Sequence, residues 1–222
     1  MAGTRVSKLQ WRTGITPILM RLSHRRYSDL FLFGVTFAEL GVLVLLTPSL
    51  LLVDWIYVLQ HLIVLGAALT RDPPQVQDRT LLALFAVALS YAYPYAQVIY
   101  LARAPGDPAW PACGFILVAL SACLSLASLV TLGRLFGIRP ALRGLATKGP
   151  YRLVRHPMYL AYILGDIGYN LEEWKLGTVL MVLFGWLALV YRIRAEERIL
   201  FRDLRWPVYA GLVRYRLVPG IW

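Results

Sequence analysis

The residues best suited to chemistry gather just ahead of a predicted helix. Arg155 and His156 precede Pro157, and proline is favoured in the first turn of a helix, where its missing N–H costs nothing. Both side chains are therefore expected beside a helix N-terminus, whose partial positive charge and unpaired N–H groups suit an anion. Anchoring by basic and aromatic residues at a membrane surface would explain the arginines and tyrosines here. It does not explain a histidine beside proline at a helix start.

A second group of charged residues, at positions 192–198, follows the last long apolar segment. If that helix continues, Arg192 and Glu196 lie at positions i and i+4, as do Arg194 and Arg198. Such a run alone is typical of a solvated, salt-bridged helix end. Together with the first group it would bring cations and carboxylates to one membrane edge, an arrangement suited to a zwitterionic ligand.

These polar groups are a minority in an apolar, basic chain. Its 222 residues are 59% hydrophobic and 16% charged, with a net charge of +11. Soluble domains have about 45–50% apolar and about 25% charged residues. The apolar content excludes strong disorder and argues against the nucleic-acid-binding module that a basic chain usually suggests. The remaining class is a membrane protein with several spans. The spacing of Cys113 and Cys123 offers neither a disulfide framework nor metal ligands, and we expect no metal site.

The elements that must position the charged groups are membrane helices. The expected fold is an all-α bundle of five to six transmembrane spans, and the fifth of six candidate segments is short for a full span. The candidates cover residues 30–46, 50–69, 81–102, 111–132, 157–171 and 174–191. With six spans, all of the 23 Lys and Arg residues except Arg103 and Lys175 share one side. The positive-inside rule then places both termini in the cytoplasm. A bacterial inner membrane and the endoplasmic reticulum fit equally well.

Polar residues inside these spans are further candidates, because charges in lipid are costly. For Glu39 and His61 we favour interhelical hydrogen bonds that fix the packing. For Asp166 a packing role and a functional role are equally open.

Several runs in the last third of the chain resemble a known family. The core of the pattern is Gly-Pro-Tyr-Arg-x-Val-Arg-His-Pro-x-Tyr at residues 149–159, with the Glu-Glu pair about 40 residues further on. The runs GRLFG (133–137), TKGPYRLVRHPMY (147–159), AEERIL (195–200) and VPG (218–220), with Tyr209, accompany it. They resemble the isoprenylcysteine carboxyl methyltransferase superfamily, whose relatives include phospholipid N-methyltransferases. The likeness covers roughly residues 130 to 222.

This resemblance implies an integral-membrane enzyme that uses S-adenosylmethionine. The cofactor would lie at the cytosolic end of the last helices, and a lipophilic or lipidated substrate would enter from the bilayer. Arg155 and His156 suit the cofactor's carboxylate, and Glu196 or Glu197 suits its ammonium or ribose hydroxyls. By family likeness the same pocket is lined by Gly149, Tyr151 and Tyr159.

Three regions follow from this reading. Residues 1–29 are expected to form a cytosolic interfacial segment on an anionic leaflet, and residues 30–132 four transmembrane helices. Residues 133–222 hold the cofactor region, the last two membrane segments and a tail from Tyr209 that could fold back as a lid. Membrane lipids are expected as partners, whereas no nucleic acid and no obligate protein partner is.

Methyl transfer is an in-line displacement on a sulfonium that depends on positioning and on exclusion of water. A carboxylate acceptor needs no base, only an arginine such as Arg192 or Arg194 to orient it. An amine or thiol acceptor must lose a proton, for which Glu196 and His156 are candidates.

Two alternatives compete with this reading. The Arg-His-Pro-x-Tyr segment also resembles NADPH-dependent membrane sterol reductases, although the length of this chain and its Glu-Glu pair favour methyl transfer. A non-enzymatic membrane protein whose basic face binds anionic lipid would need neither His156 nor Glu196.

Overall fold

The computed structural model describes residues 52–103, 107 and 110–222, together with residues 34, 36–38, 40, 41 and 45. The expected interfacial segment 1–29, most of the first expected span and Glu39 lie outside the described residues.

Helices dominate the described residues, so the predicted all-α fold class is confirmed. The α-helices are α2 (Leu52–Thr70), α3 (Leu81–Arg103), α4 (Pro111–Leu132), α5 (Pro157–Glu172), α6 (Leu176–Leu200) and α7 (Trp206–Leu212). Two 3₁₀ turns, η1 (Gly133–Leu135) and η2 (Gly149–Arg152), and two short strands, β1 (Val76–Gln77) and β2 (Ala141–Leu142), complete the chain order. The strands pair antiparallel, with Val76 opposite Leu142. As the charged run had indicated, α6 continues past Arg192, to Leu200.

Three helical stretches in the described part of the chain are long and apolar enough to cross a membrane: Leu81–Leu101, Pro111–Leu135 and Leu176–Leu200. In α2 the apolar stretch is shorter, Trp55–Ala67. The 16 residues of α5 rise only about 24 Å, against a hydrocarbon core of about 30 Å. The expected number of five to six spans therefore stays a prediction.

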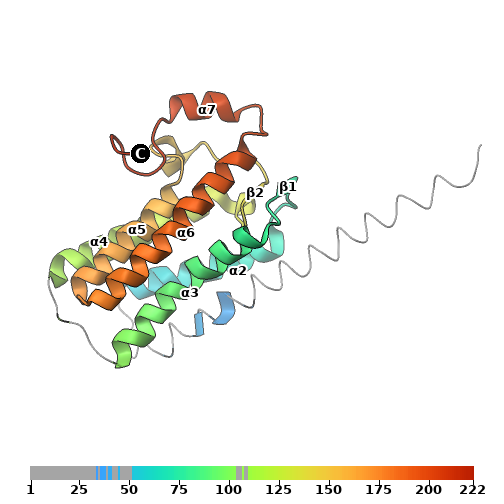
Figure 1. The fold of residues 1–222 in the computed structure, drawn as a ribbon. Coiled ribbons are helices and arrows are strands. Elements are labelled where there is room, and N and C mark those ends of the chain that lie inside the picture. The colour runs from blue at the N-terminus through green and yellow to red at the C-terminus, as the bar shows by residue number, and fades with distance from the viewer. Residues whose placement is uncertain are drawn as a thin grey trace, which may run out of the picture.

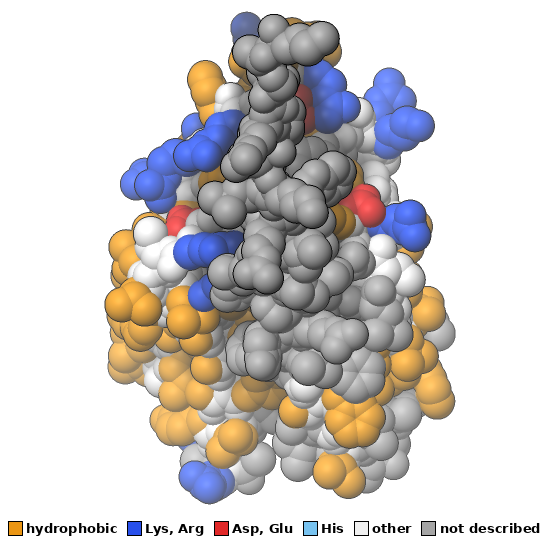
Figure 2. Space-filling view, turned by 90° about the vertical axis from the view of Figure 1, so that its right-hand side faces the viewer, with side chains coloured by type: hydrophobic (Ala, Val, Ile, Leu, Met, Phe, Trp, Pro, Cys, Tyr) orange, Lys and Arg blue, Asp and Glu red, His pale blue; other side chains and the backbone are white. Residues whose placement is uncertain are grey.

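Successive long helices run in opposite directions, so their connections gather at two ends (Figure 1). At one end the 71–80 and 133–156 segments meet through the β1–β2 pair and through the N–H of Asp72, which donates to Arg134 O at 3.1 Å. At the other end Asp107 and Trp174 form a backbone bridge. Figure 2 shows Lys and Arg side chains gathered in the upper part of the molecule above a mainly hydrophobic lower part, with one basic group at the bottom.

Small residues bring α4 and α5 into close contact. A Cβ added to Gly114 would lie 2.6 Å from the carbonyl oxygen of Gly168, and one added to Gly168 would lie 2.8 Å from that of Gly114. Nearer the middle of the pair, the hydroxyl of Ser121 donates to Ala161 O at 2.7 Å. Close backbone approach at small residues, with serine hydrogen bonds across the interface, is typical of helices packed in membranes.

Asp166 joins three helices. Its Oδ2 accepts hydrogen bonds from Tyr93 Oη of α3 and from Trp186 Nε1 of α6, each at 2.8 Å. Gly185 of α6 lets the helices approach, because a Cβ there would lie 2.6 Å from the Tyr93 ring. Of the two roles left open for Asp166, these contacts support packing.

Candidate functional site

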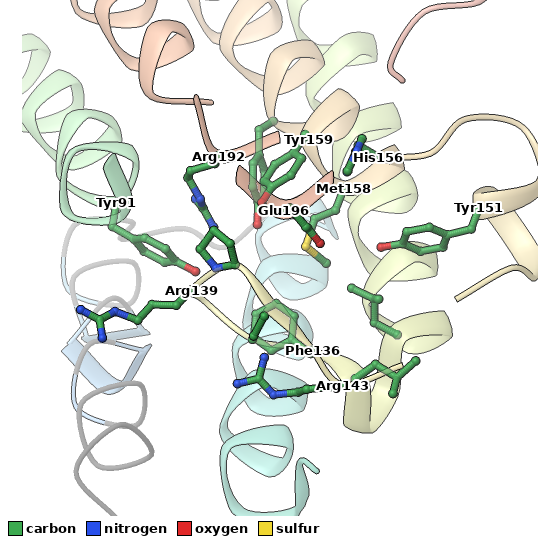
Figure 3. Close-up of a pocket in the computed structure, with 16 residues that line it drawn as sticks. Tyr91, Phe136, Arg139, Arg143, Tyr151, His156, Met158, Tyr159, Arg192 and Glu196 are labelled. Atoms are coloured by element: carbon green, nitrogen blue, oxygen red, sulfur yellow. Dashed lines mark hydrogen bonds between the residues drawn. The ribbon is translucent and has the colours of Figure 1, made fainter. Parts of the chain in front are cut away.

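A pocket opens at the basic end of the bundle, between α3, α5, α6 and the segment that follows η1 (Figure 3). Its polar lining consists of Tyr91, Arg139, Arg143, Tyr151, His156, Tyr159, Tyr162, Arg192 and Glu196. Its apolar lining includes Leu132, Leu135, Phe136 and Met158. Tyr91 and Arg139 lie on one side of the pocket, and Tyr151 points in from the opposite side.

Arg192 lies at the centre of the site and is almost completely buried, with 4% of its surface exposed. Its Nη1 donates to Ser90 Oγ at 2.7 Å and its Nη2 to Ile138 O at 2.9 Å. The guanidinium carbon lies 5.3 Å from the centre of the Tyr159 ring, a cation–π contact. Its Nε is buried and has no hydrogen-bond partner among the described residues. Because an unpaired buried donor costs free energy, Nε is suited to bind an anionic group of a ligand.

Glu196 lies one turn after Arg192, so the predicted i, i+4 arrangement holds in α6. Its Oε2 accepts a hydrogen bond from Tyr159 Oη at 2.9 Å. The pocket therefore combines a buried cation with a half-buried carboxylate.

His156 and Tyr151 form the wall opposite α6. As predicted, Pro157 begins α5, and His156 is its N-cap residue. The His156 ring is buried and lies 5.6 Å from that of Tyr159. Burial, together with the negative charge of Glu196, raises the pKa of Tyr151 well above its ordinary value. Tyr151 is therefore a neutral hydroxyl at physiological pH.

Gly149 sets the position of this wall without lining the pocket. Its φ of +53° is disfavoured for other residues, and a Cβ would lie 2.7 Å from Thr131 Oγ1 of α4. A glycine at the start of η2 thus allows the turn that brings Tyr151 inward.

Glu197 belongs to a separate network outside the pocket. Its Oε1 accepts from Arg155 Nη1 at 3.2 Å and lies 3.4 Å from His156 Nε2. Its Oε2 accepts from Arg216 Nε at 2.8 Å. One carboxylate thus meets two guanidinium groups and an imidazole.

Arg155 holds the C-terminal tail in place. Its Nε donates to Val213 O at 2.7 Å, and its Nη2 to Ala210 O and Arg214 O at 2.9 and 3.1 Å. The backbone N–H groups of Arg155 and His156 donate to the carbonyl oxygens of residues 215 and 216. The tail therefore folds back, as expected, and occupies N–H groups ahead of α5.

The structure thus divides the predicted site residues other than Gly149 into two groups. Tyr151, His156, Tyr159, Arg192 and Glu196 line the pocket together. Arg155, Arg194 and Glu197 line a second groove, between α6 and α7, on another face of α6.

Sequence reasoning missed several residues of the lining. Arg139 and Arg143 had been counted only as basic residues of a cytosolic loop, although they follow the GRLFG run that carries the resemblance. Phe136 lies in that run itself. Tyr91 comes from α3, which is distant in sequence from the runs that carry the resemblance.

The described part of the chain combines helices long and apolar enough to cross a membrane with a polar pocket at its basic end. Residues 110–203 match the family model for phospholipid methyltransferases. This match confirms the resemblance to the superfamily of membrane methyltransferases that includes the isoprenylcysteine and phospholipid enzymes. No curated protein matches the chain. The matched residues contain α4, α5, α6 and the chain between them, and therefore most of the pocket.

Proposed function

We propose that this protein is an integral-membrane, S-adenosylmethionine-dependent methyltransferase. It transfers a methyl group to a lipophilic or lipidated acceptor at the cytosolic membrane face, in the pocket around Arg192 and Glu196. The family match supports methyl transfer in a membrane. The observation that carries the location is the buried, unpartnered Nε of Arg192 within that matched segment.

The residues of the pocket fit the chemical groups of this cofactor. Arg192, with Arg139 nearby in the lining, suits the carboxylate. Glu196 suits the ammonium or the ribose hydroxyls, and the apolar wall that includes Phe136 suits the adenine. The tyrosine rings suit a sulfonium, because the faces of aromatic rings attract cations. Arg155 had been expected to bind the carboxylate, but its donors hold the tail. We therefore assign that role to Arg192.

Bound S-adenosylmethionine supplies an electrophilic methyl group. The protein contributes position and a site shielded from water. A carboxylate acceptor needs no base, only a cation of the lining to orient it. For an amine or thiol acceptor, Glu196 is better placed than His156 to accept the proton, because His156 Nε2 faces Glu197.

Calorimetry with detergent-purified protein and S-adenosylhomocysteine, the cofactor's product, tests the proposal. We expect a Kd in the micromolar range for the wild type. Glu196→Gln and Arg192→Lys should each weaken binding about 10- to 100-fold, because each removes a hydrogen bond to a charged group worth about 1.5–3 kcal/mol. Glu173→Gln, at the far end of α5, is the matched control and should bind as the wild type does.

Three outcomes would contradict the proposal. Heat with NADPH and none with S-adenosylhomocysteine would indicate a reductase, and heat with neither would favour a non-enzymatic protein. Binding unchanged in both pocket variants would place the cofactor elsewhere. Incubation of labelled cofactor with native membranes then identifies the acceptor class from the fraction that gains label: lipid, protein or a volatile product.

A further inference from the structure

The outer face of α6 carries an exposed apolar stripe. Leu180 and Leu187 are 57% and 68% exposed, and Leu176, Leu183 and Phe184 are exposed on the same face. They recur every three or four residues, as one face of a helix requires. Since α6 is one of the helices able to span a membrane, this stripe is suited to contact acyl chains.

The same face changes character at the basic end of the molecule. One turn beyond Leu187 comes Tyr191, and Arg194 and Arg198 follow. The three residues enter a groove between α6 and α7 whose lining also includes Phe201, Trp206 and Arg216. An apolar stripe thus runs directly into a cationic groove with aromatic walls.

The groove has excess positive charge. Its carboxylate, Glu197, is already bound by Arg155 and Arg216. Arg194 and Arg198 are exposed and have no carboxylate partner within the described part of the chain. Two like charges at i and i+4 on a helix repel each other. The Nε of Arg198 donates only to the backbone oxygen of Arg194, at 3.4 Å. An anion between the two guanidinium groups would relieve this repulsion.

We propose that this groove binds the headgroup of an anionic phospholipid. The phosphate lies between Arg194 and Arg198, and an acyl chain lies along Leu187 and Leu183. Basic pockets beside membrane helices on the cytoplasmic side suit anionic headgroups. The continuity of the arginines with the apolar stripe favours a lipid over a soluble anion or an acidic peptide, because neither of these would use the leucines.

This lipid site is distinct from the proposed transfer pocket. At 3.6 residues per turn, Arg194 and Arg198 lie on the side of α6 opposite Arg192 and Glu196. The bound lipid is therefore a ligand of the outer surface, and the inference does not depend on the proposed function.

The test is a titration of detergent-purified, full-length protein with dioleoyl-phosphatidylglycerol, with bound lipid counted by native mass spectrometry. The comparison probes are dioleoyl-phosphatidylcholine and free glycerol 3-phosphate. The wild type should bind the anionic lipid at least tenfold more tightly than either probe. The double variant Arg194→Gln/Arg198→Gln should bind it about 25-fold more weakly, a factor of about five for each arginine.

The matched control is Arg134→Gln/Arg152→Gln, which removes the same charge from two exposed arginines outside the groove. It should retain the wild-type affinity.

Equal loss of binding in both double variants would show that the affinity depends only on the net charge of the protein. Equal affinity for phosphatidylcholine would indicate general lipid contact, and equal affinity for glycerol 3-phosphate would indicate a soluble-anion site. Each of these outcomes overturns the proposal, as does full binding by the groove variant. Because both groove substitutions are at exposed positions, an unchanged unfolding temperature separates lost lipid binding from misfolding.

Discussion

Tyr209 connects the tail to the wall of the pocket through one hydrogen bond. Its hydroxyl donates to the backbone oxygen of Tyr151 at 2.8 Å, and Tyr151 lines the pocket. Burial, with a further contribution from Glu197 and an opposing one from Arg155, raises the pKa of Tyr209 to about 12. Only the protonated hydroxyl can donate this bond.

The raised pKa predicts how stability depends on pH. The unfolded tyrosine loses its proton near pH 10, whereas the folded one keeps it to about pH 12. The contribution of Tyr209 to stability is therefore present below pH 10 and lost as the pH rises from 10 to 12. Tyr209→Phe should lower the unfolding temperature at pH 8 and reduce its further decline between pH 10 and 12. Unfolding followed by tryptophan fluorescence measures both effects. An identical decline in wild type and variant would show that other groups control it.

At the scale of the elements, α7 and the tail are attached to the bundle by apolar packing, which places Leu217 of the tail in one cluster with Tyr159 and Ile193, and by polar contacts. One face of α7 packs Trp206 and Tyr209 against the end of α6. The tail beyond it is joined by its carbonyl oxygens to the side chain and backbone N–H groups of Arg155. The guanidinium of Arg155 also lies 5.9 Å from the Trp206 ring. A single side chain thus links the start of α5, the end of α6 and the tail.

Arg155→Gln should release the tail while leaving the helices folded. The variant loses the ion pair with Glu197 and most of the hydrogen bonds to tail carbonyls. Because bonds to charged groups contribute about 1.5–3 kcal/mol each, we expect amide hydrogen exchange in residues 213–222 to accelerate at least about 100-fold. Exchange measured by mass spectrometry tests this, with Arg214→Gln as the control, because the side chain of Arg214 is exposed. Unchanged protection of the tail amides from exchange in Arg155→Gln would show that Arg155 does not hold the tail in place.

At the scale of the whole molecule, the described helices separate a basic end from an apolar body. The pocket and the groove lie at the basic end, as does the tail, whereas the end of α3 and the start of α6 lie at the other end (Figure 1). Although α5 is short, it extends alongside α4 from the basic end as far as Gly114, the fourth residue of α4. This placement favours an α5 that crosses the membrane.

Labelling with a membrane-impermeant maleimide in sealed vesicles tests that crossing. In a background with Cys113→Ser and Cys123→Ser, one cysteine replaces Arg134 and another replaces Lys175, and α5 is the one α-helix between these two positions. We expect the two positions to react from opposite sides, the first from the cytosolic side. Both should react once detergent opens the vesicles, which is the control. Reaction of both from the same side would show that α5 does not cross and would place α6 in the opposite orientation.

Much of this architecture could be predicted from local patterns. The apolar runs predicted α3 and α4 to within a residue, and Pro157 predicted the start of α5, because both signals lie within single segments. Spacing along one helix also paired Arg192 with Glu196. The sequence presents Glu196 and Glu197 as one pair, and their order alone does not assign each to its site. In the structure they belong to different sites, because adjacent helical residues point about 100° apart. Nor could it supply Tyr91, whose contribution to the pocket depends on how α3 packs against α6.

The contact between Gly114 and Gly168 has a mechanical consequence. With backbone against backbone and Ser121 bonded across the interface, α4 and α5 can neither slide nor separate without breaking contacts along their length. They therefore behave as one rigid body, and that body carries Tyr159 and, through Thr131, the turn before Tyr151. Any widening of the pocket to admit a ligand must therefore come from the other rim, which the segment after η1 forms.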